Sequence, residues 1–272
     1  MRSRVLLVLL LLLAATPALA HPGVGIVRDR HGNVYYTDLT HVWRIAPDGR
    51  KSIAVRDVHT HELSIDSAGV LYGEDNRFVG GDRYRHRIWR RTPDGRVEDV
   101  VPWREGFWRD YGFVRDANGA MFWVTCPERV CTIHRRAPDG RTSAIVPRTP
   151  LSATVQWLAP APGGELFMLD AGALKVLGPT GEVRTLASAL GGAPMGMWPE
   201  PDGSVLVAVY GRRAVVRVTP SGKITTVARV PAPWGPSGVL RAPDGALWIL
   251  EYSTTNEARV RRVTAAGRAT VY

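Results

Sequence analysis

Residues 243–251 read Pro243-Asp244-Gly245-Ala246-Leu247-Trp248-Ile249-Leu250-Glu251, a tight turn followed at once by an apolar run that closes on an acid. Proline presets the backbone angle that opens such a turn, aspartate can bond the local backbone, and glycine takes the positive φ that closes it. The large apolar residues after the glycine are typical of a buried strand. This stretch therefore predicts a β-turn and the strand that leaves it.

The same phrase is written six times along the chain. Its turns are His31-Gly32-Asn33, Ser67-Ala68-Gly69, Ala117-Asn118-Gly119, Pro162-Gly163-Gly164, Pro201-Asp202-Gly203 and Pro243-Asp244-Gly245. A second turn follows each of them, and most have the form Pro-x-Gly: Pro47-Asp48-Gly49, Pro93-Asp94-Gly95, Pro138-Asp139-Gly140, Pro179-Thr180-Gly181, Pro220-Ser221-Gly222 and Ala265-Ala266-Gly267. Four short strands in a period of roughly 40 to 50 residues are typical of a propeller blade.

We therefore predict an all-β fold, a six-bladed β-propeller with four antiparallel strands per blade, filling residues 21–272 as one domain. A β-sandwich would not need the same unit six times. Apolar residues at alternate strand positions, such as Val34, Tyr36, Leu247 and Ile249, should face the neighbouring blades. The first and last blades each hold four strands in this scheme, so the ring closes by face packing.

The first twenty residues have the character of a secretory signal peptide. Arg2 and Arg4 precede an apolar run over residues 5–15, and Ala18-Leu19-Ala20 offers small residues for cleavage. The run is too short for a spanning helix, which needs roughly 20 residues. We expect a mature chain that starts at His21, has no membrane span, and is exported to a periplasm or secreted.

The charge balance is basic, with a formal net charge of +10 that becomes +8 without Arg2 and Arg4. The arginines are spread along the chain, so the sequence predicts no nucleic-acid partner. An anionic partner such as an envelope polysaccharide stays open, and a monomer is expected. Cys126 and Cys131 are the two cysteines. Export favours a local disulfide between them; a metal pair is the alternative.

In a propeller, the loop entering each innermost strand and the loop leaving the second strand lie on one face. The acids that end second strands should gather there: Asp38, Glu74, Asp75, Asp170 and Glu251. So should the residues that begin innermost strands: His59, His61, Glu62, Arg109, Asp110, Tyr111, Gln156, Met195, Trp234 and Ser237. Aromatic residues flank the third of these entries, namely Trp103, Phe107, Trp108 and Tyr111. They could stack on a sugar or simply pack beneath a loop.

The densest polar cluster is His59-Thr60-His61-Glu62, where both imidazoles point the same way along an extended chain. With an acid from a neighbouring strand, it could hold a divalent cation such as Ca²⁺, Mg²⁺, Mn²⁺ or Zn²⁺. Glu62, His61 and Glu74 are the candidate ligands. His59, His61, Asp170 and Glu251 are the candidate catalytic residues. The alternative is a hydrated loop whose polar groups bond the backbone.

The blade phrases, such as Gly32-Asn33-Val34-Tyr35-Tyr36-Thr37-Asp38, resemble those of NHL-repeat proteins, the senescence-marker-protein/gluconolactonase group and the virginiamycin B lyases. The gluconolactonase resemblance implies a divalent metal near the channel mouth, held by a glutamate that matches Glu62. The asparagine-glycine that this group carries is replaced by Met195-Gly196 and Ser237-Gly238. The lyase resemblance implies a late histidine base, and no histidine follows His134.

The sequence thus predicts an exported propeller that binds a small molecule or glycan on its top face. The resemblance adds a metal-dependent hydrolase of the lactonase or esterase type as the enzymatic reading. A non-catalytic NHL-like scaffold of the cell envelope is the alternative.

Overall fold

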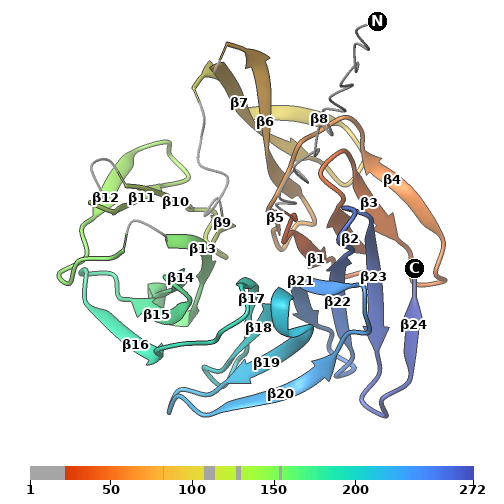
Figure 1. Ribbon diagram of the computed structural model, residues 1–272. Helices are drawn as coiled ribbons and strands as arrows, with labels where there is room; N and C mark the ends of the chain where they lie inside the picture. Colours follow the sequence, from red (N-terminus) through yellow and green to blue (C-terminus); the bar gives the residue numbers. More distant parts are fainter. Residues whose placement is uncertain (1–21, 82, 107–113, 127–129, 153–154) are drawn as a thin grey trace, which may run out of the picture.

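Six separate antiparallel sheets follow one another around a ring (Figure 1). The computed structural model describes residues 22–81, 83–106, 114–126, 130–152 and 155–272. Within these ranges each sheet has four strands that are consecutive in the chain. The predicted fold class and blade number are confirmed. The predicted signal peptide, residues 1–20, lies outside the described residues.

The strands of the first three blades have the following bounds: β1 (Ile26–Arg28), β2 (Val34–Thr37), β3 (Val42–Ile45) and β4 (Lys51–Val55); β5 (Leu63–Ile65), β6 (Leu71–Gly80), β7 (Arg83–Arg91) and β8 (Val97–Glu105); β9 (Val114–Arg115), β10 (Met121–Thr125), β11 (Thr132–Arg136) and β12 (Thr142–Ile145).

Those of the last three blades are β13 (Val155–Pro160), β14 (Leu166–Asp170), β15 (Ala173–Leu177) and β16 (Val183–Ala187); β17 (Pro194–Pro199), β18 (Val205–Val209), β19 (Ala214–Val218) and β20 (Ile224–Arg229); β21 (Gly235–Arg241), β22 (Leu247–Tyr252), β23 (Ala258–Val263) and β24 (Ala269–Val271). Two single 3₁₀ turns, η2 (Pro162–Gly164) and η3 (Tyr210–Arg212), accompany them.

In blades one to three, the first turn is fixed by the aspartate that precedes it. In blade one, Oδ1 of Asp29 accepts the backbone N–H groups of His31 and Asn33. Gly32 closes this turn at a φ of +87°, which side chains disfavour. Blades two and three repeat the arrangement with Asp66 and Asp116. The turn residues therefore set the register in which the innermost strand meets the second strand.

The core lies between the blades, because each sheet buries both faces against its neighbours. Val34 and Tyr36 of blade one share a buried cluster with Leu250 and Tyr252 of blade six. Leu247 and Ile249 pack instead toward blade five, against side chains such as Leu206. The prediction that Val34, Tyr36, Leu247 and Ile249 face the neighbouring blades is confirmed.

The ring closes without a shared strand, since blades one and six are each complete. The Tyr252 hydroxyl, fully buried, donates to the backbone oxygen of Thr37 across this junction at 2.9 Å. Face packing plus this hydrogen bond therefore joins the two ends of the repeat. In the described part of the chain, no helix has the length and apolar character needed to span a bilayer.

Candidate functional site

The innermost strands, β1, β5, β9, β13, β17 and β21, surround a central channel. We call the face where these strands begin the top face, and the face that holds the first turns the bottom face. The predicted histidine cluster belongs to the top face, and the residues of the first turns to the bottom face.

Glu74 in β6 holds the backbone of the segment that leads into β5. Its Oε1 accepts the N–H groups of His61, at 2.5 Å, and of Glu62, at 3.2 Å. Nδ1 of His61 lies 3.6 Å from the same oxygen, and the rings of His59 and His61 meet edge to face with centroids 4.7 Å apart. The structure thus places the four candidate residues, His59, His61, Glu62 and Glu74, next to one another.

The same segment is pinned by groups from two blades. The Thr37 hydroxyl of blade one donates to the backbone oxygen of Thr60 at 2.6 Å. The Thr60 hydroxyl and the Trp89 indole N–H both donate to the backbone oxygen of Glu74. Because Thr60, His61 and Glu62 are almost completely buried, the side chains around them have little freedom to move.

Burial raises the pKa of the Glu74 carboxyl from 4.5 to about 8. The backbone N–H groups of His61 and Glu62 oppose this change because they stabilise the charged form, and the nearby Asp75 adds to it. At neutral pH, Glu74 is therefore mainly protonated. It acts as a buried hydrogen-bonding group that shapes the segment, with 1% of its surface exposed.

The neighbouring acid, Asp75, anchors the start of the segment. Its Oδ1 accepts the N–H of His59 at 3.1 Å, and its Oδ2 lies 3.2 Å from the guanidinium nitrogens of Arg77 and Arg87. Asp75 is fully buried, so these two arginines balance its charge.

The other acids that end second strands are bound within their own blades. Asp38 accepts the Trp43 indole N–H at 2.6 Å. Asp170 pairs with Lys175 at 2.6 Å and also accepts the N–H of Ser152. Glu251 pairs with Arg259 and Arg261 at 2.6 and 2.5 Å. Each of these carboxylates already has a structural partner, and catalysis by Asp170 or Glu251 stays a prediction.

Residues 23–25 cross the top of the channel. The N–H groups of Val24 and Gly25 both donate to the backbone oxygen of His61 at 2.8 Å. A Cβ atom on Gly238 would lie 2.3 Å from the backbone oxygen of Val24, and one on Gly25 would lie 2.8 Å from the Leu63 nitrogen. Glycine is required at both positions, since backbone approaches backbone there.

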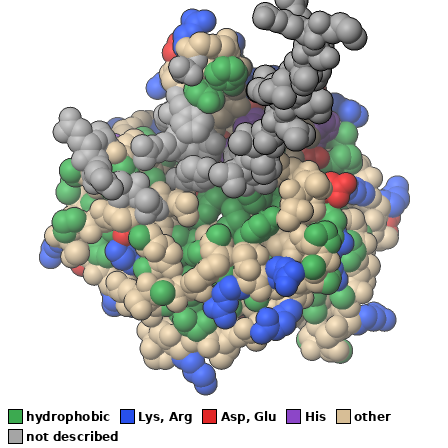
Figure 2. Space-filling model, viewed as in Figure 1, with side chains coloured by type: hydrophobic (Ala, Val, Ile, Leu, Met, Phe, Trp, Pro, Cys, Tyr) green, Lys and Arg blue, Asp and Glu red, His purple; other side chains and the backbone are tan. Residues whose placement is uncertain are grey.

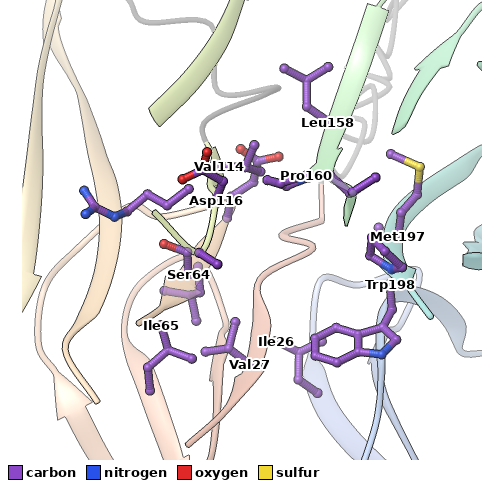
Figure 3. A pocket seen from close by; sticks show the side chains of 18 of the residues that line it. Ile26, Val27, Ser64, Ile65, Val114, Asp116, Leu158, Pro160, Met197 and Trp198 are labelled. Atoms are coloured by element: carbon purple, nitrogen blue, oxygen red, sulfur yellow. The ribbon is translucent and has the colours of Figure 1, made fainter. Parts of the chain in front are cut away.

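Below this crossing, the channel opens into a cavity of about 1010 Å³ (Figure 3). Its wall is mainly apolar and comes from the innermost strands: Ile26, Val27, Ile65, Val114, Trp157, Leu158, Met197, Trp198 and Val239. Among the described residues, those that line its top end are Val24, Gly25, Glu62 and Gly196. At the other end the lining reaches the first turns on the bottom face, including residues 116–118, 163–165 and 243.

The polar groups of this cavity differ between its two ends, and most of the charged ones lie toward the bottom face: Arg28, Arg115, Asp116, Glu165, Glu200 and Arg241. Glu62 stands at the top end with 3% of its surface exposed. Toward the bottom face, Arg241 binds Glu200 at 2.6 Å, and Asp116 is engaged with the N–H groups of its own turn. Glu62 is the carboxyl that lines the inner, top end of the channel.

The donor set matches a divalent-metal site only in part. Glu62, His61 and Glu74 are neighbours, yet the described residues hold no group of three His, Cys, Asp or Glu side chains arranged to bind a metal. Met195 and Ser237 stand where the lactonase resemblance implies asparagines. A thioether is a poor ligand for hard cations, and the Ser237 hydroxyl is fully buried, directed at the backbone oxygen of Leu250 at 3.5 Å.

The other residues that the sequence analysis named for the top face lie in different surroundings. Gln156 is exposed. The guanidinium carbon of Arg259 lies over the ring of Trp234, 3.8 Å from the ring centroid. Trp103 stacks with arginines of β6 and β7. Arg109, Asp110, Tyr111, Phe107 and Trp108 lie outside the described residues. The predicted disulfide between Cys126 and Cys131 is present, and both cysteines are buried.

The sequence did not single out the cavity wall. Trp157, Met197 and Trp198 lie on innermost strands, where apolar residues are expected in any propeller. A signal was available, because two adjacent innermost strands each carry a tryptophan, Trp157 in β13 and Trp198 in β17. Their meeting across a channel depends on the ring itself.

Comparison with known proteins finds no matching protein-family model. A virginiamycin B lyase of Nocardia farcinica is 32% identical over 135 residues, which is 50% of this chain and 46% of the relative. The match thus spans less than half the length of that relative.

Solved structures of low sequence identity share the architecture. Virginiamycin B lyase from Staphylococcus aureus has a TM-score of 0.59 at 18% identity, covering 92% of this chain and 84% of its own. A gluconolactonase from Xanthomonas campestris has a TM-score of 0.64 at 17% identity, covering 85% and 83%. The nidogen/laminin complex gives 0.67 at 15%, covering 88% and 92%. These likenesses establish the fold. Propellers with this architecture include enzymes and binding proteins, so the function has to be argued from the site.

Proposed function

We propose that the chain binds a small, mainly apolar molecule in its central cavity. The observation that carries this proposal is a channel with a mainly apolar wall and a buried carboxyl, Glu62, at its inner end. Its volume of about 1010 Å³ is at the upper limit of the roughly 300–1,000 Å³ usual for small-molecule sites. Such sites combine apolar walls with a few polar groups that orient the ligand.

Glu62 gives the ligand its orientation in this proposal. Its backbone is held by Glu74, so its side chain starts from a fixed point. A ligand that carries a hydroxyl, amide or amine would place that group against Glu62 and its apolar part against Trp157 and Trp198. If the bound molecule is a lactone or ester, Glu62 is the candidate general base for the attacking water.

The ligand enters from the bottom face, since residues 23–25 cross the top of the cavity. Ala117 lies on the bottom rim and is exposed. An Ala117→Trp variant should therefore slow ligand association. Ala266→Trp, in an exposed second turn that does not line the cavity, serves as its control.

The binding test uses a panel of apolar lactones and esters together with virginiamycin B, and gluconolactone serves as a polar comparison. The last two compounds are taken from the names of the structural neighbours. Binding is followed by tryptophan fluorescence, and hydrolysis by proton release. We expect saturable quenching that is reduced in Trp198→Phe, and at least tenfold weaker binding in Glu62→Gln. Glu182→Gln, on an exposed turn, should bind as the wild type does. Equal binding by Glu62→Gln would overturn the assignment of Glu62.

Metal dependence is a separate part of the proposal. Glu62 with His61 or His59 offers carboxylate and imidazole donors that a divalent cation could use, and Glu74 would add its carboxylate after losing its proton. Elemental analysis and calorimetry with calcium, magnesium, manganese and zinc test it. No uptake at millimolar metal would leave a metal-independent binding protein.

The competing function is a non-catalytic scaffold of the cell envelope. It is supported by the way Asp38, Asp170 and Glu251 are engaged in structural pairs. We further propose that the chain is exported after cleavage behind Ala20. Mass spectrometry of the purified mature protein would then find His21 at its N-terminus, and an intact residue 1 would contradict export.

A further inference from the structure

Blade two is built longer than the others. β6 has ten residues and β7 nine, whereas β2 and β3 of blade one have four each. Up to the pair of Asp75 and Arg87, the hairpin belongs to the ring. Beyond that pair it projects from the body of the molecule (Figure 1). We call residues 77–85, without the undescribed residue 82, the hairpin tip.

The hairpin tip exposes large apolar side chains side by side. Phe78 is 63% exposed, Val79 41% and Tyr84 36%. Phe78 and Tyr84 are directly opposite in the register, with ring centroids 5.4 Å apart. The other large exposed apolar residues of the described structure are Val97, Val130, Val146, Ile224 and Val271, none of them aromatic. A contiguous apolar patch on a projecting element indicates a contact surface.

Arginines surround this patch. Arg83 and Arg85 belong to the tip, and Arg104 in β8 stands opposite His86 of β7. None of the three forms an ion pair with a carboxylate in the described residues, although Glu105 stands opposite Arg85 in the register. The guanidinium of Arg85 lies 4.1 Å from the ring centroid of Trp103. Figure 2 shows basic and hydrophobic side chains together on this projection.

Two other arginines nearby are already neutralised. Arg77 and Arg87 share the buried Asp75, and Arg87 also pairs with Asp99. The charge available to a partner therefore comes from Arg83, Arg85 and Arg104, next to the exposed aromatic pair. Aromatic and aliphatic groups flanked by arginines match the boundary between phospholipid headgroups and acyl chains.

We infer that the hairpin tip docks on the surface of an anionic phospholipid membrane. Phe78, Val79 and Tyr84 enter the headgroup boundary, while the guanidinium groups of Arg83 and Arg85 bind lipid phosphates. An acidic protein could form ion pairs with the arginines, but it would not require exposed apolar side chains on an element that projects from the ring. The inference does not depend on the ligand proposed for the channel.

The test is sedimentation of the purified chain with vesicles of phosphatidylcholine alone or with 30% phosphatidylglycerol. We expect binding to the anionic vesicles that weakens as salt is raised, because charge attraction is screened. Arg83→Ser with Arg85→Ser should weaken binding at least tenfold, from roughly fivefold for each arginine. Phe78→Ser with Tyr84→Ser should weaken it comparably at all salt concentrations.

The matched control is Arg50→Ser with Arg141→Ser. Both arginines are exposed and pair with the aspartates of their own turns, Asp48 and Asp139. This variant loses the same formal charge and should bind anionic vesicles as the wild type does. Circular dichroism melts verify that every variant is folded. Absence of sedimentation with anionic vesicles, or an equal loss in the control variant, would overturn the inference.

Discussion

Glu74 shows how one buried side chain connects the stability of the fold with the site. The carboxyl has 1% of its surface exposed, and its pKa is raised to about 8 by burial. Between pH 5 and 8 the folded protein therefore keeps a proton that the unfolded chain has released. Since the folded state binds more protons, the free energy of unfolding falls as pH rises through this window and levels off above pH 8.

A Glu74→Gln variant should remove this pH dependence. Glutamine has nearly the same shape, and its oxygen can still accept the N–H groups of His61 and Glu62. The group contributes a slope of up to about 1.4 kcal/mol per pH unit. Urea unfolding of the wild type and the variant at pH 5 to 8 measures it. Glu182→Gln should keep the wild-type slope, and an unchanged slope in Glu74→Gln would show that Glu74 is ionised when folded.

The glycines at the top of the channel are a second case in which one atom matters. In Gly238→Ala the new Cβ would collide with the backbone oxygen of Val24, 2.3 Å away, and a backbone atom cannot move aside as the end of a flexible side chain can. Overpacking of this kind costs about 1–3 kcal/mol. A thermal melt should show a lower midpoint than in Ser221→Ala, an exposed control. A midpoint equal to that of the control would mean that residues 23–25 do not press on β21.

At the scale of the element, the turns and the strands that they connect could be predicted from the sequence. The Pro-Asp-Gly and related turns specify their own backbone angles, so each hairpin follows from local sequence. The lengths of β6 and β7 were not predicted. Basic and apolar side chains alternate in Arg77-Phe78 and in Tyr84-Arg85, as they do along strands. The turn at Gly80 and Gly81, however, does not have the spacing of the turns in the other blades.

The disulfide in blade three is an element-scale device. It links Cys126, just after β10, to Cys131, just before β11, and both cysteines lie in the buried cluster between blades three and four. Closing so short a loop stabilises a fold by roughly 2 kcal/mol. Cys126→Ser with Cys131→Ser should keep one cooperative unfolding transition at a lower midpoint, recorded by circular dichroism. Loss of cooperativity would show that the bond holds the whole blade together.

At the scale of the whole molecule, the histidine cluster was predictable and the cavity was not. His59, His61 and Glu62 are close in sequence, and Glu74 lies in the strand that pairs with β5. The cavity wall combines residues such as Val27, Trp157 and Trp198 from three blades. Their side chains are ordinary strand residues until the ring places them on one axis, so no local pattern marks them.

Self-contained blades have a consequence for engineering. Because no strand is exchanged between blades one and six, the order of the sheets along the polypeptide carries little of the architecture. A circular permutant that starts in the connection before β13, with a flexible linker joining residues 272 and 22, would preserve every sheet and every face-to-face contact. The polypeptide could then be opened far from the crossing at residues 23–25 while the pore they cover stays intact.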